Sequence, residues 1–332
     1  MYIISKGKTK SLDEIAMDHY LKLNFKSDKT TPLLDSPINY LYSLIELYKT
    51  KKDIISKNKV VFLSTFFDIY YKEIELIFLC KPLDFPSLIS KVNKLLKKNN
   101  LKPSNVRADF ESIFKYENWR QSNRSIWFFD QLNLSVCPYC NYDEIFKTNN
   151  SKKLFFDYDH YYKKSEFPYL ALSFYNLVPS CHKCNSNAKS ISNFSTKTHL
   201  HPYLNNYHHL GKFELSYKPI RFDDPFDILI TSTSKLYKRR FDRINKDLEL
   251  VDRYNSGKGK EKVIAVKKKQ NAYSETQIEE YIKNSLYADI NSRQDAINFM
   301  SDFPIEEQEI ANKLYGKLQY DMAFVFEIYK LP

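Results

Sequence analysis

The chain has 332 residues, of which 43% are apolar and 16% aromatic, a composition that favours a folded protein over a disordered one. It contains only five glycines and none of the glycine-rich phosphate-binding motifs, which argues against an ATPase or a dinucleotide-dependent enzyme. The formal net charge of +11 favours a polyanionic partner, most commonly nucleic acid, although a lysine-rich composition alone gives the same value.

The sequence also bears on the compartment. No apolar run approaches the ~18 residues that a membrane span needs, and no apolar signal segment follows the basic N-terminus. Four of the five cysteines form two CxxC pairs, a pattern that fits metal ligands in a reducing compartment better than disulfides. We therefore expect a cytoplasmic protein that does not span a membrane.

Residues 1–130 are predicted to form a helical N-terminal region. Ser11 and Glu14 have the spacing of a capping box, and Ser36 followed by Pro37 predicts a second helix start. Apolar residues at helical spacing predict further helices, which cover residues 60–79, 88–98, 105–118 and 124–133.

Residues 211–332 are predicted to be mostly helical, with a short β element. The two expected strands run from Lys212 to Ser216 and from Ile228 to Thr233. Helices are expected over 235–254, after a capping box at Ser274 and Gln277, and over 306–330. The segment 256–269 carries six lysines and two glycines, and it is predicted to be an exposed loop or a frayed helix end.

The central segment, residues 131–210, is rich in cysteine, histidine, asparagine and aspartate. Cys137 and Cys140 form one CxxC pair, and Cys181 and Cys184 form the second after forty intervening residues. Two such turns provide the four sulfurs of a tetrahedral Zn²⁺ site, which is structural because no coordination position remains for substrate. Cys80 lies outside this pattern and is predicted to be a core residue.

The chemistry is therefore expected from the polar residues between and beside the pairs. Asp159 and His160 follow a short β-prone run, Asn176 comes sixteen residues after His160, and Asn185 directly follows Cys184. Imidazole can activate water near neutral pH, whereas carboxylate and amide oxygens suit Mg²⁺ or Mn²⁺. This combination is suited to phosphodiester hydrolysis. Each residue also has a structural interpretation, as a strand-end histidine, a turn aspartate or a helix cap.

The stretch DHYYKKSEFPYLALSFYNLVPSCHKCNSNAK, residues 159–189, resembles the HNH endonuclease superfamily, in the ββα-metal subgroup that carries a CxxC…CxxC zinc staple. The resemblance covers residues 137–203 and includes His199 and His201, in HLHPY, which look like the HPY element of this subgroup. The flanking regions are similar to those of HNH effectors of Septu-type anti-phage defence systems, which are encoded beside an ATPase partner.

The resemblance implies a role for each motif residue. His160 would activate water, Asp159 and Asn185 would bind one Mg²⁺ or Mn²⁺, and Asn176 would brace the loop that carries the base. The third motif position holds Asn185 where the superfamily has nominally a histidine. An amide oxygen still suits a hard cation, so the departure is compatible with activity and changes the ligand atom that this position offers to the metal.

Four further residues are candidates for contacts with the nucleic-acid backbone. Lys163 and Lys164 follow the base closely. Lys189 lies one turn beyond Asn185, where a solvated lysine is the simpler interpretation. His201 could contact phosphate, support the site indirectly or lie on an ordinary surface. His182, inside the second CxxC pair, is expected to be exposed rather than a zinc ligand.

We therefore predict a mostly α-helical α+β fold in which a central zinc-stapled HNH module lies between two helical regions. The predicted function is a metal-dependent endonuclease that cleaves phosphodiester bonds, most readily in DNA, as an antiviral effector with an ATPase partner. Three alternatives stay open: a catalytically silent, zinc-dependent nucleic-acid-binding or interaction subunit, an effector that is inert until its partner assembles, and an RNA-cleaving nuclease.

Overall fold

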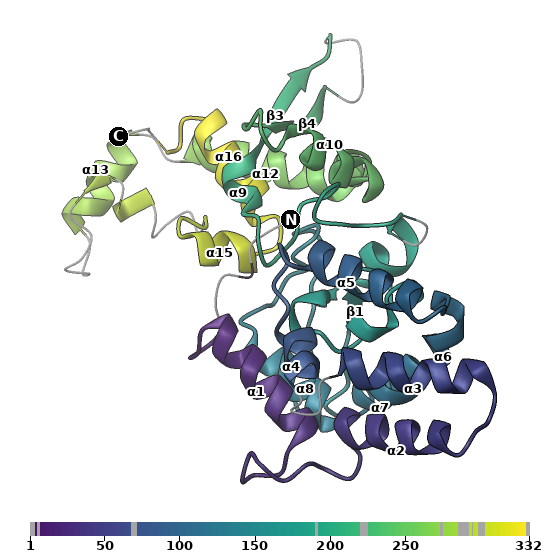
Figure 1. The fold of residues 1–332 in the computed structure, drawn as a ribbon. Helices are drawn as coiled ribbons and strands as arrows, with labels where there is room; N and C mark the ends of the chain where they lie inside the picture. The colour runs from purple at the N-terminus through teal and green to yellow at the C-terminus, as the bar shows by residue number, and fades with distance from the viewer. Residues whose placement is uncertain are drawn as a thin grey trace.

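The structure is a computed structural model that describes residues 4, 7–67, 72–189, 192–219, 225–272, 275–284, 292–293, 295–297 and 303–329. These residues form a mostly helical fold with two separate two-stranded antiparallel sheets, as predicted for an α+β protein that is mainly α. In Figure 1 the N-terminal helices fill the lower part of the view and the C-terminal elements the upper part.

The N-terminal region is helical, as predicted. Its helices are α1 (Leu12–Asn24), α2 (Pro37–Lys49), α3 (Ile54–Phe66), α4 (Lys72–Leu79), α5 (Phe85–Lys98), α6 (Pro103–Phe114), α7 (Tyr116–Arg120) and α8 (Asn123–Gln131). The single buried helix predicted over 60–79 is wrong, because α3 ends at Phe66 and α4 begins at Lys72. The helix predicted over 105–118 is likewise divided, since Lys115 adopts a left-handed conformation with φ of 40° between α6 and α7.

The two predicted helix starts in this region are confirmed. The Ser11 hydroxyl accepts a hydrogen bond from the Glu14 amide at 3.3 Å, and the Glu14 carboxylate accepts from the Ser11 amide at 2.8 Å. Ser36 caps α2 by accepting from the Asn39 amide at 3.2 Å, with Pro37 in the first turn. These local hydrogen bonds satisfy amides that have no partner inside the helix.

The first sheet lies between these helices and the C-terminal elements. Strand β1 (Asp157–His160) pairs antiparallel with β2 (Leu177–Ser180), and His160 is opposite Leu177. The connection between the strands contains two short helical turns, Pro168–Leu170 and Phe174–Asn176. A helical segment, Lys183–Ala188, directly follows β2, so the order of elements is strand, strand, helix.

The C-terminal region begins with α9 (Tyr207–Leu210) and a hairpin of β3 (Gly211–Tyr217) and β4 (Phe226–Ser232), which confirms the two predicted strands. Its helices are α10 (Lys238–Asp247), α11 (Leu250–Asn255), α12 (Gly257–Ala272), α13 (Glu275–Asn284), α15 (Glu307–Asn312) and α16 (Gly316–Val325). Ser274, the predicted cap of α13, lies outside the described residues. The helix predicted over 306–330 is two helices, with Tyr315 in a left-handed conformation between them.

The segment 256–269, predicted to be an exposed loop or a frayed helix end, is neither, because residues 257–269 lie within α12. Val263 and Val266 are 1% and 2% exposed and pack into the C-terminal apolar cluster. The two buried valines, three residues apart, place one face of α12 in the core, while Lys258, Lys262, Lys267 and Lys268 are exposed.

Apart from a small cluster around Ile310 and Ala311, the buried apolar residues of the described chain form two large clusters. The larger one is continuous from α1 through the β1–β2 hairpin to α10 and α11, so the central segment shares its core with the N-terminal helices. The smaller one joins β3 and β4 to α12, α13 and α16. None of the described helices combines the length and the apolar character needed to cross a membrane.

A histidine lies in the larger cluster, where burial controls its protonation. His19 is 1% exposed, its Nε2–H donates to the Leu172 carbonyl at 2.9 Å, and its ring packs against Phe128 at 5.1 Å. Burial lowers the pKa of His19 from 6.5 to about 4. The unfolded chain therefore binds a proton below pH 6.5 that the folded chain binds only near pH 4, so acid destabilises the fold within this window.

We predict that the free energy of unfolding falls less steeply with acid in the variant His19→Gln, which keeps an N–H donor for Leu172 and has no titratable ring. Between pH 7 and pH 5 the wild type should lose about 2 kcal/mol more than the variant. Urea denaturation of both proteins at the two pH values measures this difference. Equal losses would show that His19 does not carry this pH dependence.

Candidate metal centre and candidate active site

The four cysteines of the two CxxC pairs meet at one buried point. Their sulfurs all lie within 4.8 Å of one another, and the Cys140 and Cys181 sulfurs are 3.9 Å apart. None of the four forms a disulfide. A tetrahedral zinc with bonds of about 2.3 Å would hold its sulfurs about 3.8 Å apart, so this cluster fits Zn²⁺. Among the described residues it is the only such group of metal-binding side chains. The four cysteines predicted to bind metal thus form a potential metal-binding site, and Cys80 lies elsewhere in the core.

Arg253, at the end of α11, contacts this cluster and is a residue that the sequence did not identify. Its guanidinium donates to the Cys184 sulfur at 3.1 Å and to the Asp143 carboxylate at 3.1 Å. A cation beside thiolates offsets their negative charge and orients them, as outer-shell partners of metal sites do. Arg253 lies 69 positions after Cys184 in the sequence, so no local spacing pattern predicts this contact.

Asn141, directly after the first CxxC pair, attaches the C-terminal helices to the cluster. Its Nδ2 donates to the carbonyls of Ile310, Ala311 and Lys313 at 3.0–3.2 Å, and its Oδ1 accepts from the Lys317 amide at 3.2 Å. Asn141 is fully buried with φ of 52°, a left-handed conformation that asparagine tolerates. The turn that carries two sulfurs is therefore also the attachment point of α15 and α16.

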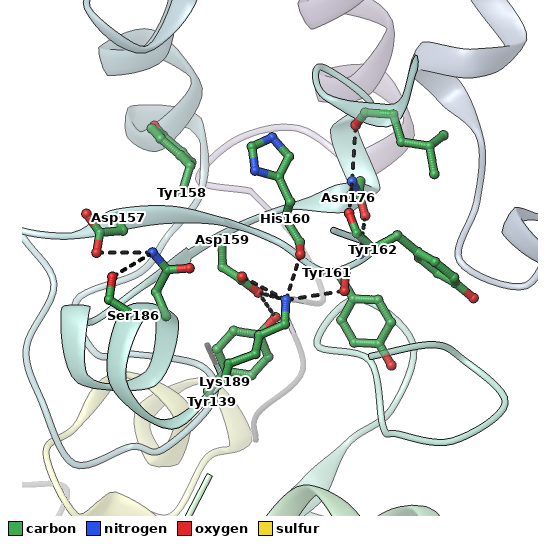
Figure 2. A network of polar contacts seen from close by, with 12 residues as sticks. Tyr139, Asp157, Tyr158, Asp159, His160, Tyr161, Tyr162, Asn176, Ser186 and Lys189 are labelled. Atoms are coloured by element: carbon green, nitrogen blue, oxygen red, sulfur yellow. Dashed lines mark hydrogen bonds and ion pairs between the residues drawn. The ribbon is translucent and has the colours of Figure 1, made fainter. Parts of the chain in front are cut away.

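The strand β1 presents different residues on its two faces. Side chains alternate along a strand, so Asp157 and Asp159 share one face and Tyr158 and His160 the other. In Figure 2, His160 points away from the helical segment Lys183–Ala188, and the two aspartates point towards it. The residues predicted to act as base and as metal ligand thus lie on opposite faces of this strand.

The Asp159 carboxylate is held by two protein donors. Lys189 Nζ lies 2.7 Å from both carboxylate oxygens, and the Tyr139 hydroxyl donates at 2.6 Å (Figure 2). Asp159 is 4% exposed and Lys189 3%. Both carboxylate oxygens thus face an ammonium group, which occupies the side where a cation would bind.

Lys189 therefore differs from its sequence interpretation as a solvated lysine or a phosphate contact. Its ammonium also donates to the backbone carbonyls of His160 at 2.6 Å and Tyr161 at 3.2 Å. Burial lowers the pKa of Lys189, and the nearby Asp159 charge opposes that shift. The side chain closes an internal network and does not face solvent.

Asn185 contacts Asp157 and forms no hydrogen bond to Asp159. Its Nδ2 lies 3.2 Å from the Asp157 carboxylate, and His182 Nδ1 lies 2.9 Å from the same oxygen. The His182 side chain is 72% exposed, as expected, and Asp157 is 33% exposed. Asp157 was missed by sequence reasoning, although its position two residues before Asp159 on one strand face was a usable signal.

His160 is held in a single orientation. Its Nε2 lies 3.0 Å from the Ala171 carbonyl, which can only accept, so this nitrogen carries the proton and Nδ1 carries the lone pair. The ring meets Tyr116 edge-on at 4.5 Å. Burial lowers the pKa of His160 to about 4, so the imidazole is neutral at pH 7. Tyr116 and Ala171 also line a cavity of about 580 Å³, together with Lys164.

Asn176 lies in the loop that returns from β1 to β2, and it is fully buried. Its Oδ1 accepts from the Tyr162 amide at 2.7 Å, and its Nδ2 donates to the carbonyls of Tyr162 and Leu170 at 3.1 Å. These three hydrogen bonds tie the residues after His160 to the loop that provides Ala171. Such contacts are what a bracing residue requires.

The remaining predicted basic residues occupy different environments. Lys164 pairs with Glu117 at 2.6 Å and lies over the Tyr116 ring, and Lys163 is partly buried. His201 is fully buried, with its ring 4.0 Å from that of Tyr161, and burial lowers its pKa to about 3. His201 is therefore part of the core and not of the surface.

No protein-family model, no curated protein and no solved structure matches this chain. Its function is therefore inferred from its own residues and their geometry.

We predict that the purified protein contains about one zinc ion per chain and that Cys181→Ser loses it, because three sulfurs cannot complete the tetrahedral shell. Cys80→Ser is the matched control, since Cys80 is a buried thiol outside the cluster and its loss should leave the zinc in place. Elemental analysis of the three proteins measures the metal. A zinc content that stays the same in Cys181→Ser would contradict the four-sulfur site.

Proposed function

We propose that this protein is a zinc-stapled HNH-type endonuclease in which His160 activates the attacking water. The observation that carries the proposal is the state of His160, a neutral imidazole with a fixed tautomer at the end of a β-hairpin. The strand–strand–helix order and the adjacent four-sulfur cluster add support, because they match the ββα arrangement that the sequence resemblance implies.

The chemistry follows from the free nitrogen of His160. Within the described residues its Nδ1 forms no hydrogen bond, so its lone pair can accept a proton from water as the oxygen attacks phosphorus. The bond from phosphorus to the leaving oxygen then breaks, and that oxygen gains a proton. The Nε2–H bond to Ala171 keeps the ring in place, and the Asn176 hydrogen bonds hold the Ala171 loop against the residues that follow the base.

The implied Mg²⁺ or Mn²⁺ requires a different set of ligands from the one predicted. Asp159 and Asn185 do not fit a shared cation as they are arranged, because Lys189 occupies both Asp159 oxygens. Asp157 and Asn185 are already in contact, and His182 offers a third donor beside them. We propose that Asp157 and Asn185 would hold the ion, which would neutralise charge on a phosphate oxygen when bound.

We propose DNA as the substrate. The resemblance of the flanking regions to Septu-type effectors extends the proposal to an ATPase partner and to antiviral defence. A silent nucleic-acid-binding subunit, an effector that cuts only with its partner, and an RNA nuclease are the competing functions. These alternatives give different results in a single cleavage assay.

We predict that the wild type nicks plasmid DNA in Mg²⁺ or Mn²⁺ and that His160→Ala lowers the rate by about 100-fold or more, the usual contribution of a general base. His209→Ala is the matched control, because His209 is an exposed histidine that pairs with Glu307 far from β1 in the sequence. Its rate should equal that of the wild type. The measurement is the initial rate of conversion to nicked circles.

Other outcomes identify the competing functions. Equal DNA binding by wild type and His160→Ala without cleavage in any metal would favour the silent binding subunit. Cleavage that begins only when a co-encoded ATPase is added would favour the partner-dependent effector. Faster cleavage of RNA than of DNA would identify an RNA nuclease.

We predict that Asp157→Asn weakens Mn²⁺ binding at least 10-fold, whereas Asp159→Asn leaves it unchanged in the folded protein. Asp159→Asn should instead lower the unfolding free energy by about 3–5 kcal/mol, because it leaves Lys189 buried without its counter-charge. Electron paramagnetic resonance of free Mn²⁺ measures the first effect and urea denaturation the second. If folded Asp159→Asn lost Mn²⁺ binding and Asp157→Asn kept it, the ion would be assigned to Asp159 instead.

A further inference from the structure

A basic groove lies along α10, outside the candidate active site. The cavity measures about 710 Å³, and its lining is dominated by charged side chains. Five of them are cationic: Lys197, Arg239, Arg240, Arg243 and Lys246. Asp242 and Asp247 are the two acidic side chains in the lining.

The two acidic residues differ in their partners. Asp242 pairs with Lys238 at 2.8 Å. Asp247 lies 2.9 Å from His199 Nε2, but burial lowers the pKa of His199, so a neutral imidazole leaves the Asp247 charge in place. Of the five cations, Arg240 donates a hydrogen bond to the Thr196 carbonyl. Within the part of the chain that the structure describes, the side chains of the other four form no hydrogen bond or ion pair; these are Lys197, Arg239, Arg243 and Lys246. The groove therefore holds five positive charges against the single uncompensated charge of Asp247.

These charges are arranged along one face of α10. Arg239, Arg243 and Lys246 are spaced at i, i+4 and i+7 and are all exposed, whereas Phe241 and Ile244 are fully buried on the opposite face. Three cations on one face span about 10 Å along the helix axis. A row of this length can follow successive phosphates of a nucleic-acid strand.

The groove is joined to the strand that carries His160. Arg240 donates to the Thr196 carbonyl at 3.1 Å, and the Thr196 amide donates to the Tyr162 hydroxyl at 3.1 Å. The Tyr161 hydroxyl donates to the His199 carbonyl at 3.1 Å. The segment 196–199 is thus held on one side by the two residues after His160 and on the other by α10.

We propose that this groove binds the phosphodiester backbone of the nucleic-acid duplex that the enzyme cleaves. The inference rests on the proposed function for the identity of the substrate, and the groove supplies the place where that substrate is held. Guanidinium groups suit phosphate because they donate two parallel hydrogen bonds, and each neutralised phosphate releases counterions.

The lining favours nucleic acid over an acidic protein. Leu236 is its one large apolar side chain, whereas protein interfaces depend on aromatic and apolar anchors in a desolvated centre. Backbone contacts also carry no sequence information, so this groove would fix position and not specificity.

The test removes three charges from the groove and three from an unrelated helix. The groove variant is Arg239→Gln, Arg243→Gln and Lys246→Gln. The matched control is Lys94→Gln, Lys97→Gln and Lys98→Gln, three exposed lysines on α5 that leave the same net charge. Fluorescence anisotropy of labelled DNA and RNA duplexes of one sequence is measured against salt without added divalent cations, so no cleavage intervenes. Zinc content and melting temperature verify that each variant is folded.

The groove variant should lose affinity on the order of 100-fold at ~0.1 M salt, and its salt dependence should become shallower by about 3 in log–log slope, or 0.9 per lost contact. The control should change by less than about 3-fold, because exposed charges distant from the site are screened. A stronger effect on DNA than on RNA, or the reverse, identifies the duplex that the groove prefers.

Equal losses in both variants would overturn the groove, since net charge alone would then explain binding. Unchanged binding of the groove variant would overturn it too, as would wild-type binding of polyglutamate as tight as that of the duplex. The plasmid assay separates this result from the proposed function. The groove variant could lose binding while His160→Ala cleaves as fast as wild type. This combination would rule out the catalytic role of His160 and leave the groove proposal standing.

Discussion

The convergence of four cysteine sulfurs at one buried point is the constraint on which the rest of this structure depends. The sulfurs come from two turns, and each turn is also attached to another part of the chain. Cys181 directly follows β2 and thus fixes the β1–β2 hairpin, whereas Asn141, after Cys140, binds the backbone of residues 310–317. Tyr254 donates to the Cys140 carbonyl at 2.7 Å. A metal bound there would hold the hairpin, α11 and the C-terminal helices together.

The hairpin itself is too small to hold its residues in place. Two strands of four residues have few ladder hydrogen bonds, and isolated hairpins of this size are marginal in water. The structure compensates on both faces of β1. On one face, Tyr158 and His160 pack against aromatic residues of α7 and α8, and on the other, Asp157 and Asp159 contact the helical segment after Cys181. The candidate site residues are therefore fixed by contacts with three separate parts of the chain.

Sequence patterns predicted the features that depend on neighbouring residues. The CxxC spacing, the caps at Ser11 and Ser36 and the two short strands β3 and β4 are all local features, and the structure bears them out. The pairings across the site are not local. Asn185 lies in the helical segment Lys183–Ala188 and Lys189 directly follows it, whereas Asp157 and Asp159 lie two residues apart on one face of β1. The packing of the helical segment on β1 pairs Asn185 with Asp157 and Lys189 with Asp159. No local sequence spacing predicts this pairing.

This pairing changes the role that Asp159 can have in the site. A carboxylate next to a catalytic histidine is naturally taken for a metal ligand, but here it holds a buried ammonium whose other contacts are the carbonyls of His160 and Tyr161. Burying such a pair is costly, and it persists where the geometry is good and every remaining donor has a partner. Lys189 meets that condition with carboxylate and carbonyl acceptors. Asp159 thus acts on His160 through the backbone: it holds Lys189, Lys189 holds the His160 carbonyl, and the end of β1 that carries the imidazole is fixed in place.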